Sequence, residues 1–262
     1  MGWRPSRRTL IRTAVIGAAG AGVAWVATRP RDLPTGVTFV EGHFTTPRWP
    51  GGNPWWGVAI PARPKATVIA LHGLGGDGKR WFDAYDAAQV ASDTGLAIAA
   101  VDGGSTWWHA RSSGIDTGAL VSLDLIPALS AAGLPTDRLG FTGLSMGGFG
   151  ALLLGSGLPP ASVIAIAAMS SAVWPTWASV PVGSAFDGPD DFAAHDVFGR
   201  ADALAKVPVW LACGTEDNLL PSNRSLAALL PHATTVFDAG KHEGDYWRGH
   251  LPAAAAFIRD HV

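Results

Sequence analysis

Residues 141–150 read FTGLSMGGFG and hold one serine, Ser145, among glycines between two apolar runs. Glycine permits strained or closely packed backbone, and it weakens helices and strands where nothing requires it. The residues before the serine, 138–143, have the pattern of a short buried strand, and residues 146–155 have that of a packed helix. A strand, a sharp turn with a serine at its apex, and a helix form the arrangement in which Gly-x-Ser-x-Gly presents a nucleophile. The stretch therefore predicts Ser145 as a nucleophile.

Length and composition limit the class of protein. The chain has 262 residues, 48% of them hydrophobic, and a formal net charge of −2. One α/β domain of this length is common, so we predict a single folded domain over residues 34–262. The small charge and the lack of a basic stripe argue against a nucleic-acid partner. The single cysteine, Cys213, excludes an intrachain disulfide, and no Cys/His run has zinc-site spacing, so we predict no metal and no cofactor.

The first 33 residues differ in kind from the rest. Residues 6–12, SRRTLIR, place paired arginines ahead of a run of small apolar residues at 13–28, which indicates an export signal of the twin-arginine type. The run is shorter than the roughly 20 residues of a membrane-spanning helix, which favours cleavage over a permanent anchor. No strong small-x-small cleavage site appears near Ala27, so the sequence leaves both open. We expect a secreted or envelope-associated protein that contacts the membrane only through this segment.

Apolar runs alternate with helical patterns along the remaining chain. We expect strands within residues 38–49, 55–61, 66–73, 95–104, 138–143, 162–171, 207–214 and 234–240, and helices at 79–92, 117–133, 146–155 and 252–261. The first two strands alternate as antiparallel strands at the start, and the others are apolar enough to be buried on both faces. This order implies an α/β fold, a mostly parallel central sheet flanked by helices. Residues 171–191 predict a small lid or an irregular loop.

The partners of the serine are found from chain order. A serine hydroxyl needs a histidine to take its proton and a carboxylate to orient that histidine. With an elbow of this type the order is serine, acid, histidine, and the acid and histidine follow late strands. We therefore predict a triad of Ser145, Asp217 and His242. Glu216 is the alternative acid, although the Gly-Thr-x-Asp turn favours its neighbour. The rival histidines lack the required placement: His195, His232 and His250.

The tetrahedral intermediate of this chemistry needs two N–H donors for its oxyanion. One is expected from Met146, the residue after the nucleophile. The other is expected from the glycine-rich residues 72–78, HGLGGDG, where position favours the N–H of Leu74.

Candidate substrate contacts are His72, Trp108 and Trp174. Both tryptophans fall in loops predicted to surround the site, and the chain has 12 tryptophans against two tyrosines. Tryptophan faces suit sugar rings and acyl groups, yet each is first a large apolar side chain that packs. A buried histidine with satisfied hydrogen bonds explains His72 equally well.

These motifs resemble the esterase family of α/β hydrolases that contains S-formylglutathione hydrolase, feruloyl esterases and the envelope mycolyltransferases. The resemblance runs from about Gly57 to the end and rests on LHGLGGDGKRWFDAY at 71–85, GLAIAAVDGGSTWWH at 95–109, GLSMGGFGALLLG at 143–155 and GKHEGDYW at 240–247. It implies an α/β-hydrolase fold with a small lid or none, a Ser-Asp/Glu-His triad and no cofactor. The chain is shorter than the mycolyltransferases and has His-Gly-Leu where they carry an acidic residue before glycine.

We therefore expect an exported serine esterase acting on short- to medium-chain esters, including acyl groups on an envelope glycan. Two alternatives stay open. One is an acyltransferase that moves an acyl group to a sugar or lipid alcohol, and the other is an inactive hydrolase-fold binding protein. The sequence does not specify acyl length, the alcohol or the oligomeric state.

Overall fold

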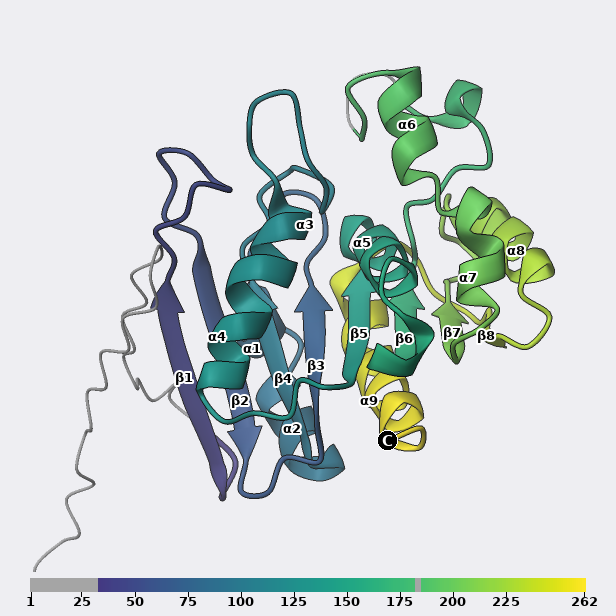
Figure 1. The fold of residues 1–262 in the computed structure, drawn as a ribbon. Coiled ribbons are helices and arrows are strands. Elements are labelled where there is room, and N and C mark those ends of the chain that lie inside the picture. The colour runs from purple at the N-terminus through teal and green to yellow at the C-terminus, as the bar shows by residue number, and fades with distance from the viewer. Residues whose placement is uncertain (1–32, 182–184) are drawn as a thin grey trace, which may run out of the picture.

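The computed structural model describes residues 33–181 and 185–262 of the chain, so the predicted export signal lies outside the described residues. The described residues form one eight-stranded sheet in the order β1-β2-β4-β3-β5-β6-β7-β8 (Figure 1). The strands are β1 Val37–His43, β2 Trp55–Pro61, β3 Ala66–Leu71, β4 Leu96–Val101, β5 Leu139–Leu144, β6 Val163–Met169, β7 Val209–Ala212 and β8 Thr234–Val236. β2 is antiparallel to both β1 and β4, and the remaining pairs are parallel. The predicted mostly parallel sheet with an antiparallel start is confirmed.

Helices cover both faces of this sheet (Figure 1). They are α1 Arg80–Asp83, α2 Ala87–Thr94, α3 Thr117–Leu120, α4 Ile126–Ala131, α5 Met146–Ser156, α6 Pro189–His195, α7 Ala201–Leu204, α8 Leu220–Leu229 and α9 Gly244–Arg259. Buried side chains of α1, α2 and α9 belong to one apolar cluster, and those of α3, α4, α5, α7 and α8 belong to another. The sheet therefore separates two cores.

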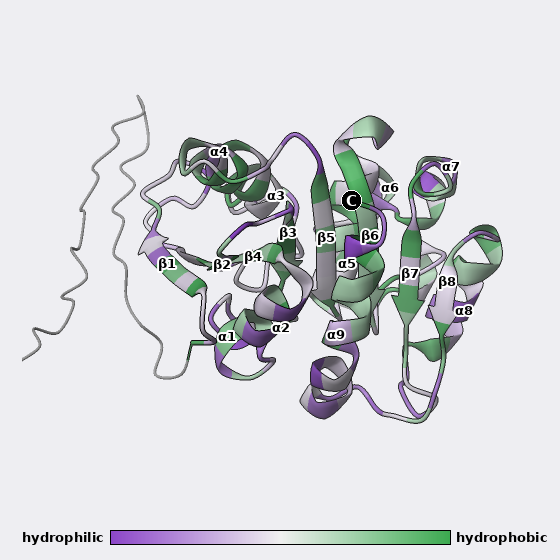
Figure 2. Ribbon diagram, turned by 90° about the horizontal axis from the view of Figure 1, so that it is seen from below, coloured by the Kyte–Doolittle hydropathy of each residue, from purple (hydrophilic) through white to green (hydrophobic). Residues whose placement is uncertain are grey.

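The central strands behave as their composition predicts. Every residue of β3, β4, β5 and β6 is buried. Figure 2 shows the hydrophobic colour concentrated on the inner strands, while α2 and α9 carry hydrophilic residues on their outer sides. A strand buried on both faces needs apolar residues on both, which explains why these strands read as continuous apolar runs.

Three helices differ from the sequence prediction. The helix expected at 117–133 ends at Ala131, and a π-helical turn, Val121–Leu125, joins α3 to α4. The helix expected at 79–92 is broken into α1 and α2, because Asp86 takes a left-handed conformation with φ 56°. The last helix begins at Gly244, well before the expected residue 252, and carries Pro252 inside it. Asp116 caps the start of α3, since its carboxylate accepts a hydrogen bond from the Ala119 N–H at 2.8 Å.

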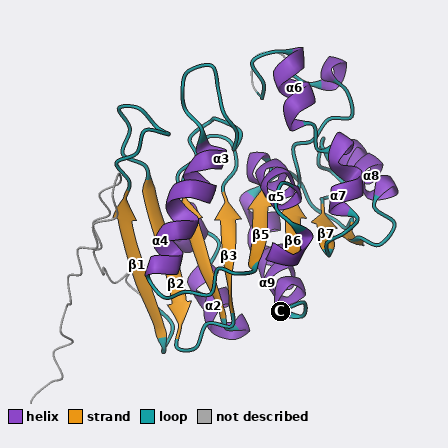
Figure 3. Cartoon of the chain, in the orientation of Figure 1, coloured by secondary structure: helices purple, strands orange, loops and turns teal. Residues whose placement is uncertain are grey.

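The segment between β6 and β7 includes residues 171–191, for which we expected a small lid or an irregular loop. It contains a 3₁₀ turn at Trp177–Ser179 and then α6 and α7. α6 lies beyond the carboxyl ends of the strands, at the edge where the connecting loops gather (Figure 3). Across residues 33–181 and 185–262, no helix combines the length and apolar character that crossing a bilayer requires.

Candidate active site

Ser145 lies at the turn between β5 and α5, with φ 54° and ψ −118°. A non-glycine residue at positive φ is strained, and such strain concentrates at functional sites. Two neighbouring glycines make the turn possible. A Cβ added at Gly143 would overlap the carbonyl of Gly147, and one added at Gly147 would overlap the carbonyl of Leu71. These glycines therefore allow the start of α5 to lie directly against β3 and β5.

The three predicted triad side chains form one hydrogen-bonded chain. Ser145 Oγ lies 2.9 Å from His242 Nε2, and His242 Nδ1 lies 2.8 Å from Asp217 Oδ2. Because a carboxylate can only accept, His242 donates from Nδ1 to Asp217, and its Nε2 lone pair accepts the Ser145 hydroxyl proton. Asp217 and His242 follow β7 and β8, so three strand ends supply the three groups.

Asp217 is a buried carboxylate held in place by donors. Its side chain is fully buried, and its second oxygen accepts the N–H of Leu219 at 2.8 Å. Burial by itself raises the pKa of Asp217, but the hydrogen bonds from His242 and Leu219 outweigh it, so the pKa lies below its usual value. Glu216 instead points to solvent, 3.9 Å from Lys241 Nζ. Asp217, and not Glu216, contacts His242.

The two expected oxyanion donors lie beside the serine. Met146 is the first residue of α5, so no earlier helical carbonyl accepts its N–H. A Cβ added at Gly73 would lie 3.4 Å from Ser145 Cβ, which places the loop containing Leu74 against the nucleophile. Within the described part of the chain, neither the Leu74 nor the Met146 N–H donates to another protein group outside the helix ladder. Both are free for an oxyanion.

His72 does not contact substrate, contrary to the sequence expectation, because it is 1% exposed. Its Nδ1 lies 2.8 Å from the carbonyl of Gly73, and its Nε2 accepts the N–H of Gly103 at 2.8 Å. Burial lowers the pKa of His72, which favours the neutral ring with the proton on Nδ1. The ring ties the loop after β3 to the loop after β4.

Trp108 is also a packing residue and not the expected substrate contact, since its side chain is fully buried. Its indole Nε1 donates to the carbonyl of His72 at 3.3 Å, and its ring fills the space above Gly103 and Gly150. Trp174 retains 8% exposure and packs at 5.3 Å, ring centre to ring centre, on Trp107. Its contact with substrate stays a prediction.

Two further residues define the chemistry of the site. The Trp247 ring meets the His242 ring edge-on at 5.0 Å. The motif GKHEGDYW at 240–247 contains this tryptophan, but the sequence did not indicate the ring contact.

Cys213 is buried, and burial and the nearby Asp217 charge raise the pKa of its thiol to about 12. A thiol that stays protonated is a poor nucleophile, so Ser145 is the nucleophile that the site offers.

Comparison with known proteins agrees with this architecture. Residues 123–258, just over half of the chain, match the family model named Esterase. A ferulic acid esterase superposes with a TM-score of 0.73 at 17% identity, covering 86% of this chain and 99% of its own. An S-formylglutathione hydrolase from Agrobacterium tumefaciens gives 0.75 at 15% identity, covering 88% and 97%. MPT51 of Mycobacterium tuberculosis gives 0.65 at 19% identity, covering 79% and 94%. No curated protein sequence matches. The α/β-hydrolase fold is thus confirmed.

Proposed function

Because the chain belongs to the esterase family of α/β hydrolases, we propose that it cleaves carboxylic esters through an acyl-enzyme formed on Ser145. One observation carries this proposal: the unbroken hydrogen-bond chain from Asp217 through His242 to a serine on a strained turn. The same geometry argues against an inactive binding protein, which would have no need of a strained serine paired with a histidine.

The reaction follows from the positions of these groups. Ser145 Oγ attacks the ester carbonyl carbon while its proton passes to His242 Nε2. The negative charge that forms on the carbonyl oxygen is stabilised by the N–H groups of Met146 and Leu74. The bond to the alcohol then breaks, and His242 returns the proton to the departing oxygen. Water, activated by the same histidine, attacks the acyl-enzyme and releases the acid. Asp217 holds the ring in orientation and stabilises its positive charge.

Covalent labelling tests the role of Ser145. An organophosphonate is expected to add once to the chain, and Ser145→Ala should abolish labelling and lower kcat by about 10⁶. Ser156→Ala, at the other end of α5, is the control, because its hydroxyl donates to the carbonyl of Leu153 within the helix. Intact-mass spectrometry measures the adduct, and labelling that persists in Ser145→Ala would reject the proposal.

The preferred substrates are short- to medium-chain esters, including acyl groups carried by an envelope glycan. Phe149, one helical turn after Ser145, meets Trp107 edge-on at 6.0 Å, and Trp107 packs against Trp174, so this side of the nucleophile is lined by large aromatic rings. Each methylene that a site buries contributes about 0.8 kcal/mol, so a short site stops gaining kcat/KM as the acyl chain grows. With p-nitrophenyl esters from C2 to C16, activity is expected to peak at or below about C6. A steady rise to C16 contradicts this preference.

Hydrolysis and acyl transfer share the acyl-enzyme and differ only in the acceptor. The ester panel is therefore run with and without sugar acceptors, and the products are identified by mass spectrometry. Free acid as the main product supports the esterase, whereas acylated sugar at the expense of acid identifies an acyltransferase. The paired arginines before the apolar run support export of the enzyme by the twin-arginine route.

A further inference from the structure

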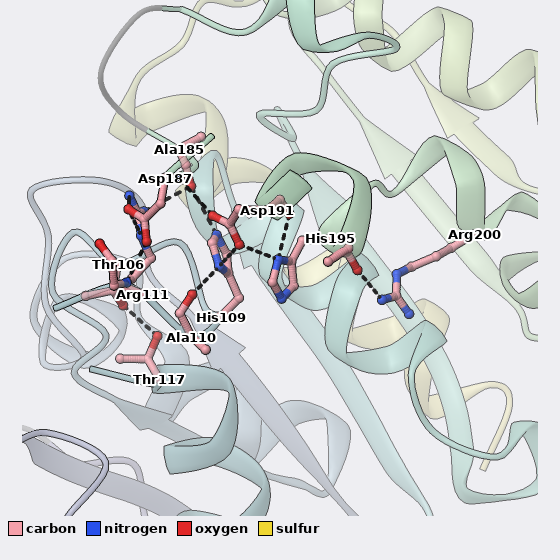
Figure 4. Close-up of polar contacts among 12 residues, drawn as sticks. Thr106, His109, Ala110, Arg111, Thr117, Ala185, Asp187, Asp191, His195 and Arg200 are labelled. Atoms are coloured by element: carbon pink, nitrogen blue, oxygen red, sulfur yellow. Dashed lines mark hydrogen bonds and ion pairs between the residues drawn. The ribbon is translucent and has the colours of Figure 1, made fainter. Parts of the chain in front are cut away.

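Three metal-ligating side chains meet outside the candidate active site, where α6 approaches the loop after β4 (Figure 4). Asp191 and His195 are four residues apart on α6 and so share one helical face. His109 reaches them from the loop after β4. One ligand atom from each residue lies within 4.8 Å of the others.

The spacing of these atoms suits a tetrahedral ion. Asp191 Oδ1 lies 2.9 Å from His195 Nδ1 and 3.7 Å from His109 Nδ1. Zinc bonds of roughly 2.0–2.1 Å in tetrahedral geometry place ligand atoms about 3.3 Å apart. The two observed distances bracket that value. The rings of His109 and His195 stack with their centroids 4.2 Å apart, so a shared ion requires the rings to rotate until both Nδ1 atoms face it.

His109 has a hydrogen-bonding conflict that an ion would resolve. Its Nε2 lies 3.0 Å from the carbonyl of Ala185, and its Nδ1 lies 2.9 Å from the carbonyl of Ala110. A neutral imidazole has one N–H, so it can donate to only one of these two carbonyl oxygens. If Nε2–H donates to Ala185, the Nδ1 lone pair faces a carbonyl oxygen and the Asp191 carboxylate. A cation bound at Nδ1 turns this repulsion into attraction.

The surroundings of the cluster also fit a metal site. A ligating histidine commonly donates its other N–H to a carbonyl, as the Ala185 contact provides. The second oxygen of Asp191 accepts the N–H of Asp187 at 2.8 Å, which orients the first oxygen toward the histidines. A cavity of about 320 Å³, lined by both His109 and His195, offers an entry path and room for a water ligand. Arg200 also lines this cavity, but its guanidinium donates to the carbonyl of Ala194 at 3.0 Å and so is held by α6.

We propose that His109 Nδ1, Asp191 Oδ1 and His195 Nδ1 bind a divalent transition-metal ion, with Zn²⁺ as the best match and water as the fourth ligand. Two imidazoles with one carboxylate suit Zn²⁺ better than the oxygen-seeking Mg²⁺ and Ca²⁺. Binding displaces the proton of His195 Nδ1 into solvent.

The ion would link α6 to the loop after β4, which lies next to the candidate active site. His109 stacks on Phe186 at 5.5 Å and meets Phe149 edge-on at 6.2 Å. Phe149 in turn donates its N–H to the carbonyl of Ser145 at 3.1 Å. The metal site would therefore hold Phe186 and Phe149 in place next to the nucleophile without contacting the reacting atoms.

Metal titration of the chelator-treated full chain tests the proposal. Calorimetry with ZnCl₂ is expected to give about one ion per chain with a Kd at or below about 10 μM, and Zn²⁺ should raise Tm. Asp191→Asn and His195→Ala should each weaken binding by about 100-fold or more. His232→Ala, at an exposed histidine, is the matched control and should leave binding unchanged.

Two further measurements keep the test decisive. Co²⁺ should give visible absorption bands that Asp191→Asn and His195→Ala remove, which reports the ligands even if these variants are less stable. Zn²⁺ binding should persist in His242→Ala, because the triad histidine is not part of the cluster. Binding that disappears in His242→Ala but survives in His195→Ala, or no saturable binding below about 100 μM, overturns the proposal.

Discussion

At Ser145 the backbone conformation is unfavourable by roughly 1–3 kcal/mol, and the surrounding structure holds it there. The N–H of Ser145 donates to the carbonyl of Met169 at 2.9 Å, and its carbonyl accepts the N–H groups of Phe149 and Ala172, both at 3.1 Å. These bonds hold Ser145 to the end of β6, to the loop after β6 and to the first turn of α5. The Ser145 hydroxyl is therefore already at hydrogen-bonding distance from His242 before substrate binds.

The acid of the triad gives a prediction at the same scale. Asp217→Asn should lower kcat by about 10⁴, because a carboxamide favours the wrong imidazole tautomer and cannot stabilise the imidazolium. Glu216→Gln is the neighbouring control and should change kcat by less than about threefold, since an exposed ion pair contributes little. Steady-state ester kinetics measure both variants, with circular dichroism to check folding. A larger loss in Glu216→Gln would reassign the acid.

Single residues also show where sequence reasoning succeeds. Ser145, Asp217 and His242 could be predicted because strand ends and chain order leave few candidates for each role. His72 and Trp108 could not be assigned, because a histidine or tryptophan near a site has the same sequence pattern whether it packs or binds. Only the burial of each ring and its contacts with backbone carbonyls distinguish the two.

At the scale of elements, the packing of α5 on β3 gives a second prediction. Gly147→Ala should strongly reduce Tm and soluble yield, because its Cβ would overlap the carbonyls of Leu71 and His72. Gly249→Ala is the matched control inside α9, where an added Cβ meets nothing within 4 Å. That change should stabilise the helix by about 0.5–1 kcal/mol. Thermal unfolding compares the pair, and equal Tm values would contradict the close approach of α5.

The junction of β8 and α9 gives a prediction about pH. Asp238 accepts the hydroxyl of Tyr246 at 2.9 Å and faces His250 Nε2 at 3.0 Å. Desolvation alone raises the pKa of Asp238, but these hydrogen bonds outweigh it, so the pKa lies below its usual value. A lowered folded-state pKa means that the charged form stabilises the fold above that value and that this contribution is lost as pH falls through the lowered pKa.

Asp238→Asn should therefore lower Tm at pH 7, and the difference from the unchanged chain should shrink below about pH 4. Asp260→Asn is the control, because Asp260 pairs only with the adjacent, exposed Arg259 in the described structure. Scanning calorimetry at pH 7 and pH 3 measures both. A difference that grows on acidification would show that the charged form does not stabilise the junction.

Helix boundaries show the limit of prediction at this scale. Apolar periodicity indicates one helix over 79–92, yet the backbone turns left-handed at Asp86, and the chain continues as a second helix. The early start of α9 at Gly244 was hidden by glycine and by the later Pro252, both weak helix formers. Tertiary packing against the sheet outweighs these local preferences.

At the scale of the whole molecule, the parallel sheet gathers its functional groups at one edge. The carboxyl ends of β5, β7 and β8 carry the three triad residues, and those of β3 and β4 carry the two loops joined by His72. Because this edge is implied by strand order, the triad was predictable from sequence. The cluster of His109, Asp191 and His195 was not, since the contact between α6 and the loop after β4 follows from no spacing in the chain.

Export is the last prediction, and it concerns the chain as a whole. The single cysteine is buried and unpaired, so the domain needs no disulfide and can complete its fold in a reducing compartment before transport. A folded cargo is what the twin-arginine route carries. In a reporter fusion to the full chain, Arg7→Lys with Arg8→Lys should retain the reporter inside the cell. Arg4→Lys with Arg12→Lys is the matched double change and should leave export intact. Fractionation of cells measures both, and export that survives the first pair but stops when the general secretory route is inhibited would assign the signal to that route instead.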